Sequence, residues 1–323
     1  AGTFIDVFAS DEAWGRVGAV EEFLPGLSPL IEAVHQAGAK IGIQLVHGNR
    51  LPLGLSPEDT YGEPIAPSPR RESDPPNVFL QPEESMRELT TSEIEFIISK
   101  FATAAANVKK GCFDFVEFHS AHGYLPCQFL SPLYNRRTDK YGGDLNGRMR
   151  FGIECIGAMR KAVGEDFPIS VRLGVEQRVP GGLTLAEGVE VASAFEKAGA
   201  DVISVSLADH IPVPLPTSDY PMGCFAYLAG AVKQKVNVPV MAVGRINTIE
   251  VAENILSKGQ ADLIAIGRQL IADPFWVNKA KERKVEDINP CLSCNDCLES
   301  ISTGELRCAV NAAAGREEEY RIV

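Results

Sequence analysis

Short apolar runs recur along the chain and alternate with longer amphipathic stretches. Each run is nearly continuous in Val, Ile, Leu or Phe, which is typical of a strand covered on both faces. A shorter stub of the same kind stands at residues 3–5. The pattern predicts six strands, at residues 41–46, 113–118, 169–173, 201–206, 238–243 and 262–266.

The stretches between these runs carry helix start and stop signals. Glycine closes most of them, as at helix C-terminal caps, and Thr184-x-x-Glu187 has the pattern of a capping box. Strands and helices that alternate at this spacing predict parallel βα units. Helices are predicted at residues 28–36, 91–109, 146–163, 184–199, 248–258 and 274–283.

Six units and the stub predict an α/β fold, a (β/α)₈ TIM barrel that lacks its first strand and most of its second. A doubly wound open sheet is the alternative, but no Gly-x-Gly-x-x-Gly turn follows an early strand. The Pro-rich insertion at 51–85 is expected to form a loop above a strand end, where long loops are usually functional. We expect residues 1–285 to form the barrel domain, incomplete at its N-terminus, and residues 286–323 to form a short cysteine-rich segment and the start of a linker.

Composition excludes several classes of protein. The chain has 323 residues, 45% of them hydrophobic, and a formal net charge of −12. That charge argues against nucleic-acid and anionic membrane partners, and no run of about 18 apolar residues predicts a membrane span. The chain begins within a strand-like stretch and stops within a segment, so we expect a piece of a longer polypeptide. We expect a cytoplasmic protein; the oligomeric state is open, with a homo-oligomer among the alternatives.

Polar residues follow the predicted strand at 113–118 directly. His119, His122 and Tyr124 can each donate a hydrogen bond or a proton, and they lie within six residues. A single histidine here would more often be a satisfied loop residue. Three donors after a buried strand instead predict an active site at the C-terminal rim of a parallel barrel.

Longer motifs around this loop carry a family resemblance. They read His119-x-x-His122-Gly-Tyr124-Leu125, Gln128-Phe129-Leu130-Ser131-Pro132 and Asn135-Arg136-Arg137-Thr138-Asp139-Lys140-Tyr141-Gly142-Gly143. The pattern resembles the old yellow enzyme family of FMN flavoproteins, and it extends over essentially the whole chain. The nearest branch is the iron–sulfur one, with 2,4-dienoyl-CoA reductases, bacterial enoate reductases and trimethylamine dehydrogenase. We expect a structural role for residues 135–148.

The resemblance implies roles for the three donors that their chemistry also suits. Two imidazoles can offer a pair of N–H groups to one carbonyl oxygen as negative charge builds on it. A tyrosine two residues further on is suited to act as a general acid. His119 and His122 are thus expected to anchor the substrate carbonyl, and Tyr124 to protonate the α-carbon. His210, in a Pro-rich loop, is a candidate second acid for extended dienes.

Other residues are expected to hold FMN. Gln44 lies inside an apolar strand, where a polar group needs a partner, and the resemblance places it at the flavin pyrimidine edge. Arg172 is placed beside flavin N1 and O2, where a fixed cation favours the anionic reduced flavin. The last two predicted strands each end in Gly-Arg, a sequence suited to binding a phosphate. These phosphate-site residues are Gly244, Arg245, Gly267 and Arg268.

Four of the eight cysteines crowd into residues 291–308. Zinc sites usually show two separated Cys pairs, whereas three closely spaced Cys and one further Cys suit a four-iron four-sulfur (4Fe-4S) cluster. Disulfides are a weaker alternative in a reducing compartment. The expected cluster ligands are Cys291, Cys294, Cys297 and Cys308.

These residues predict an oxidoreductase that reduces the C=C bond of an α,β-unsaturated carbonyl, enoyl or dienoyl substrate with electrons from NAD(P)H. The resemblance implies that NAD(P)H and FAD bind a C-terminal module, which would begin just beyond Val323. The spacing between Cys294 and Cys297 is nearer that of the amine dehydrogenases, so an amine dehydrogenase that passes electrons to an external carrier is the alternative. A third hypothesis is a non-enzymatic electron-relay subunit. The partner is expected to be a small-molecule carbonyl compound or acyl-CoA.

Overall fold

Seven parallel strands form the main sheet of the computed structural model, which describes residues 4–9, 24–47, 50–51, 63–71, 86–208, 216–301 and 304–320. Their order in the sheet is β1-β2-β6-β7-β8-β9-β10. The strands are β1 (Phe4–Ala9), β2 (Lys40–Leu45), β6 (Phe115–Ser120), β7 (Ile169–Gly174), β8 (Val202–Ser206), β9 (Val240–Ala242) and β10 (Leu263–Ile264).

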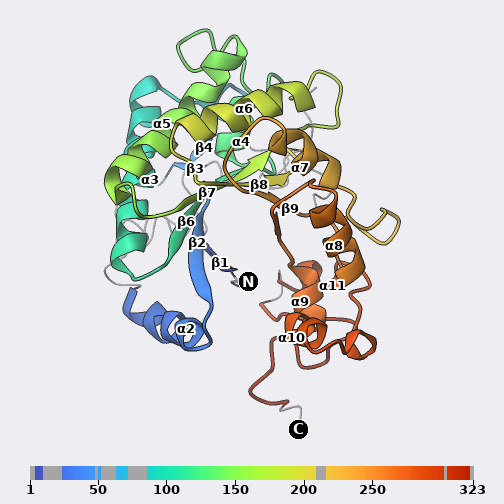
Figure 1. Cartoon of the computed structure of the whole chain (residues 1–323). Coiled ribbons are helices and arrows are strands. Elements are labelled where there is room, and N and C mark those ends of the chain that lie inside the picture. Colours follow the sequence, from blue (N-terminus) through green and yellow to red (C-terminus); the bar gives the residue numbers. More distant parts are fainter. Residues whose placement is uncertain are drawn as a thin grey trace.

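The sheet is that of a TIM barrel. Its strand order follows the chain without a reversal, whereas a doubly wound sheet reverses direction at a switch point. The sheet curls, with its strands on the inside and its helices on the outside (Figure 1). It supplies seven of the eight strands of a (β/α)₈ barrel. Strand β1 has six residues and pairs with β2 along its whole length, so it is longer than the stub expected from the sequence.

Helices cover the outer face of the sheet in chain order (Figure 1). Each follows the strand to which its unit belongs, which is how right-handed βα units build a barrel. The covering helices are α2 (Leu24–Gln36), α3 (Thr91–Lys110), α5 (Leu145–Val163), α6 (Leu185–Lys197), α7 (Ala226–Lys233) and α8 (Ile249–Ser257).

Side-chain caps explain where several helices begin. Thr90 and Glu93 form a capping box at the start of α3, and Thr184 and Glu187 form the predicted one at the start of α6. The Asp144 side chain accepts a hydrogen bond from the Gly147 amide at the start of α5. These local signals are legible in the sequence because each needs only residues within one turn.

The outward faces of the strands pack against these helices. Phe118 of β6 is fully buried, and its ring lies 4.9 Å from that of Phe101 in α3, at an edge-to-face angle. Phe129, in the segment after β6, stacks on Phe151 of α5 with ring centroids 4.3 Å apart. The core therefore lies between sheet and helices, and the inward strand positions are left for other side chains.

A short helix that the apolar pattern did not predict follows β6. Helix α4 (Leu125–Leu130) is buried at every residue, so it has no polar face to produce a helical period. The helix expected at 274–283 is shorter in the structure, where it is α10 (Trp276–Lys281). It is preceded by α9 (Arg268–Ala272) and followed by the 3₁₀ helix η1 (Val285–Asp287) and by α11 (Asp296–Ile301). The C-terminal segments gather beside α9 and α10 (Figure 1).

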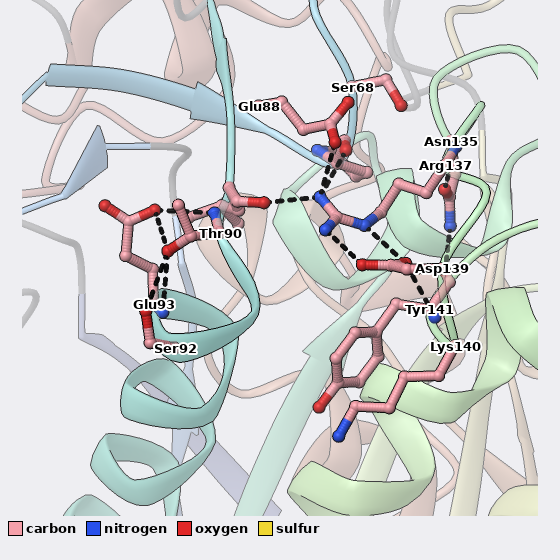
Figure 2. Close-up of polar contacts among 12 residues, drawn as sticks. Ser68, Glu88, Thr90, Ser92, Glu93, Asn135, Arg137, Asp139, Lys140 and Tyr141 are labelled. Carbon is pink, nitrogen blue, oxygen red and sulfur yellow. Dashed lines mark hydrogen bonds and ion pairs between the residues drawn. The ribbon is translucent and has the colours of Figure 1, made fainter.

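Polar contacts of Arg137 tie the loop at 135–143 to other parts of the fold, as Figure 2 shows. Arg137 is buried, and its guanidinium donates to the carbonyl oxygens of Pro67 at 3.0 Å and Leu89 at 2.6 Å. It also makes a two-point contact with Asp139, at 3.0 and 2.6 Å. Arg137 thereby ties the loop to a small sheet made of β3 (Arg50–Leu51), β4 (Glu63–Ala66) and β5 (Arg87–Glu88).

Candidate active site and cysteine pocket

Polar side chains occupy alternate positions at the carboxyl ends of neighbouring strands. Alternation places residues two apart on the same face of a strand, and in a barrel one face points inward. Strand pairing aligns these residues in two layers, since Gln44 pairs with Glu117 and Glu117 with Ser170. One step further, His119 pairs with Arg172 and Arg172 with Ser204.

The three predicted donors come together. The His119 ring lies 5.1 Å from that of His122 and 4.8 Å from that of Tyr124, measured between centroids. His119 belongs to strand β6 rather than to the loop expected from the sequence, and Tyr124 directly precedes the first residue of α4. His122 has a φ of 56°, a left-handed conformation that is uncommon outside glycine and typical of functional turns. The tight turn therefore folds the histidines onto each other.

His119 is held as a neutral imidazole. Burial lowers its pKa well below the usual 6.5, and the charges of His122 and Arg172 lower it further. The Ala121 amide donates to its Nδ1 at 3.3 Å, so Nδ1 is the acceptor nitrogen and Nε2 carries the proton. The free N–H of His119 is thus its Nε2–H.

Strand β8 braces both the second histidine and the arginine. His122 Nε2 lies 2.8 Å from the hydroxyl of Ser206. Arg172 donates from Nη1 to the hydroxyl of Ser204 at 3.0 Å. The two serines were not among the predicted site residues; their alternation in Ser204-Val205-Ser206, in an otherwise apolar strand, is the signal that could have found them.

Gln44 has one unsatisfied atom. Its Nε2 donates to Glu117 at 2.5 Å, while its Oε1 is buried and has no hydrogen-bond partner. An unpaired buried carbonyl costs about 1–3 kcal/mol. A bound group that donates a hydrogen bond here would remove that cost, so the residue suits a ring with an N–H at its edge.

The two Gly-Arg turns lie beside the cysteine segment. Gly244 has a φ of 112°, and a Cβ there would meet the Phe225 ring at 2.7 Å; a Cβ at Gly267 would meet nothing within 4 Å. Arg245 donates to the Ser293 hydroxyl at 3.2 Å and to the Tyr220 carbonyl. Arg268 donates to the Asn295 side chain and, at 2.8 Å, to the Pro216 carbonyl. The space beside the Gly267 backbone is therefore open, and a phosphate could approach the turn there.

All four clustered cysteines line one pocket, together with Arg268, Leu292, Asn295, Ala309 and Val310. Asn247 and Gln269 fix its wall, because Asn247 donates to the Cys291 carbonyl at 3.1 Å and the Cys291 amide donates to Gln269 at 2.8 Å. Within the described residues, no three His, Cys, Asp or Glu side chains are placed to hold a single metal ion. His210 lies outside the described residues.

The fold and the site together define a class: a parallel βα barrel with proton donors, a cation and an unsatisfied amide at its C-terminal rim. The family model described as NADH:flavin oxidoreductase / NADH oxidase matches residues 19–287. The chain therefore belongs to this family of flavin oxidoreductases. No helix in the described ranges combines the length and apolarity that a membrane span needs.

Curated relatives agree with that assignment. The chain is 46% identical to an NADH oxidase of Thermoanaerobacter brockii over 93% of its own length and 46% of the relative's. It is 35% identical to a cinnamate reductase of Clostridium sporogenes over 93% of its length and 47% of the relative's. The chain thus spans about half the length of these curated relatives.

Two solved structures, one of a reductase and one of a dehydrogenase, are similar in fold to this chain. One is a complex of 2-naphthoyl-CoA reductase with 2-naphthoyl-CoA, at 32% identity and a TM-score of 0.82, covering 93% of this chain and 46% of that one. Another is histamine dehydrogenase from Rhizobium sp. 4-9, at 30% identity and a TM-score of 0.80, covering 91% of this chain and 42% of that one.

Buried neutral histidines make stability depend on pH. Burial lowers the pKa of His47 from 6.5 to about 4, so the unfolded chain binds more protons between these values and stability falls as pH falls below 6.5. For His47 alone, the loss from pH 7 to pH 5 is about 2 kcal/mol, and His119 adds to it. We expect urea unfolding at pH 7 and pH 5 to show this loss of unfolding free energy in the wild type, and a smaller loss in His47→Gln. Equal losses in the two proteins would contradict the lowered pKa of His47.

Proposed function

We propose that this chain is the catalytic part of an FMN- and iron–sulfur-dependent enzyme that reduces the C=C bond of an α,β-unsaturated carbonyl, enoyl or dienoyl substrate. The observation that carries the proposal is the convergence of two imidazoles and a phenol at the carboxyl end of β6. The similarity to a cinnamate reductase and a 2-naphthoyl-CoA reductase supports a conjugated acid or acyl-CoA as the substrate class.

The histidines bind and polarise the substrate carbonyl. His119 offers its Nε2–H, because its Nδ1 is occupied by the Ala121 amide. When the Ser206 hydroxyl donates to His122 Nε2, His122 in turn offers its Nδ1–H. Two N–H groups on adjacent rings can then share one oxygen and stabilise the negative charge that develops on it.

Tyr124 is the proton source. Its ring lies 4.8 Å from that of His119, so a carbonyl held by the histidines has its α-carbon close to this side chain. A phenol that delivers a proton in the transition state contributes typically about 10²–10⁴-fold to the rate. Tyr124 gives its proton to the α-carbon, and solvent restores it.

FMN supplies a hydride when bound. Gln44 would meet its ring edge, and Arg172 would place a fixed cation beside the ring. The backbone at Gly244, Arg245, Gly267 and Arg268 would receive the phosphate. In the structure the Arg245 and Arg268 side chains contact residues 293 and 295, so we assign the phosphate mainly to the backbone amides of the two turns.

The cysteine pocket would hold a 4Fe-4S cluster. In such a cluster each thiolate binds a different iron, so the sulfur atoms line a cavity without converging on one point. The four cysteines surround one pocket, and in the described residues they do not converge on a single point where one metal ion could bind. This placement fits a cluster. We propose residues 1–285 as the FMN barrel and residues 286–323 as the cluster segment, and that NAD(P)H and FAD bind elsewhere in a longer protein. His210 remains a proposed second acid for dienes.

An amine dehydrogenase is the second candidate, favoured by the similarity to histamine dehydrogenase. It would need aromatic faces for a cationic amine. Trp276, one of the two tryptophans, is buried in α10. Anaerobic mixing separates the two candidates: bleaching of the flavin by a trialkylamine, with no reoxidation by enones, would reject the reductase.

Replacing Tyr124 with Phe tests the proton donor. We expect reoxidation of the reduced full-length enzyme by an enone to slow by about 10²-fold or more, while reduction by NAD(P)H keeps its rate. Stopped-flow absorbance of the flavin measures both steps, and Tyr320→Phe, at an exposed tyrosine, serves as the control. Unchanged reoxidation would remove Tyr124 from the mechanism.

Gly267→Ala tests the phosphate site. The added Cβ meets nothing in the protein, so the unfolding free energy should hold, while FMN affinity should fall about tenfold as the methyl group enters the phosphate position. Riboflavin, which lacks the phosphate, should bind wild type and variant alike. Equal loss for both ligands would contradict the site. Gly244→Ala should instead destabilise the fold, because its Cβ would clash with Phe225.

Iron and acid-labile sulfide should be present in the purified full-length protein. We expect about four of each per chain, and Cys294→Ser should lower both. Metal analysis together with the absorption spectrum measures this. Stoichiometric zinc without sulfide would overturn the cluster.

A further inference from the structure

Glu117 is a buried carboxylate without an assigned role. It lies inside strand β6 and is 2% exposed. One carboxylate oxygen accepts from Gln44 Nε2 at 2.5 Å and the other accepts from the Ser170 hydroxyl at 2.7 Å. No ion pair to Glu117 is found in the described part of the chain. Its hydrogen-bond donors are the uncharged side chains of Gln44 and Ser170.

A carboxylate accepts hydrogen bonds and does not donate them. It can therefore face only the NH₂ end of the Gln44 amide, because a flipped amide would set oxygen against oxygen. The Gln44 Oε1 is thereby turned away from Glu117, and this atom is the buried one that has no partner.

We propose, on the basis of the function above, that Glu117 is a positioning residue that makes Gln44 accept a hydrogen bond from the flavin imide. The N3–H group is the one donor on the pyrimidine edge of the isoalloxazine ring, between two carbonyl acceptors. A glutamine free to flip could meet either kind of group. Locked by Glu117, Gln44 presents a carbonyl oxygen, which selects a ring with an N–H at that place.

The layer arrangement supports this assignment. Gln44, Glu117 and Ser170 are in register across three adjacent strands, one layer below His119, Arg172 and Ser204. The acceptor is thus built into the rigid sheet rather than into a loop, as expected for a group that must hold its orientation before the cofactor binds.

A double-mutant cycle on the full-length protein tests the coupling. Glu117→Gln allows the Gln44 amide to flip, and Gln44→Met removes it, so each should weaken FMN binding by about tenfold, measured by quenching of flavin fluorescence. If Glu117 acts through Gln44, the double variant should bind about as weakly as Gln44→Met alone. Ser170→Ala, which leaves the Gln44 contact intact, is the matched control and should stay within about twofold.

Exchange of the flavin imide proton provides a second readout, and its first outcome is measured on the wild-type protein. With FMN labelled with ¹⁵N at N3, the bound imide proton should exchange with water more slowly than in free FMN, and Glu117→Gln should restore fast exchange. Fast exchange in the wild type, or losses that multiply in the double variant, would overturn the role of Glu117. Failure of the wild type to bind FMN at all would instead overturn the proposed function.

Discussion

The alternation of side chains along parallel strands in fixed register is the constraint on which this structure depends. Apolar residues at one parity, such as Phe118, pack under the helices. Polar residues at the other parity point to the interior and meet across strands, as Gln44, Glu117 and Ser170 do. A shift by one residue would exchange the two sets and bury the polar groups under the helices. The same register therefore builds both the core and the site.

Electrostatics in the site follow from this placement. Arg172 and the buried His119 are neighbours in the sheet, and their proximity helps to keep His119 uncharged. A neutral imidazole with a known acceptor nitrogen is a hydrogen-bond donor of fixed direction. The serines of β8 add partners that hold His122 and Arg172 without adding charge. Arg172 thus supplies a fixed positive charge, while His119 contributes a hydrogen-bond donor of fixed direction.

The cysteine segment is integrated with the barrel. Residues that follow β9 and β10 reach it through side chains: Arg245 and Asn247 contact Ser293, Arg268 contacts Asn295, and Gln269 contacts Cys291. The turns proposed for the phosphate and the pocket proposed for the cluster therefore share a wall. Hydrogen bonds link the two turns directly to the wall of the pocket.

Much of the architecture could be read from the chain itself. Strand positions, glycine stops and the capping box at Thr184 depend on residues close together in sequence, so their physics is local. The three donors after β6 were also legible, because their spacing is short. Helix α4 was not, since a helix buried on all sides has no polar period.

The class of fold, the donor loop and the cysteine cluster can be recognised from the amino-acid sequence, because each is a pattern carried by residues close together in the chain. Which polar groups meet depends on how the strands pair in the folded chain. Glu117 stands 73 positions from Gln44 and 53 from Ser170, and Ser206 stands 84 from His122. Contacts of that kind arise when strands pair side by side, and no local preference specifies which residue will lie opposite which.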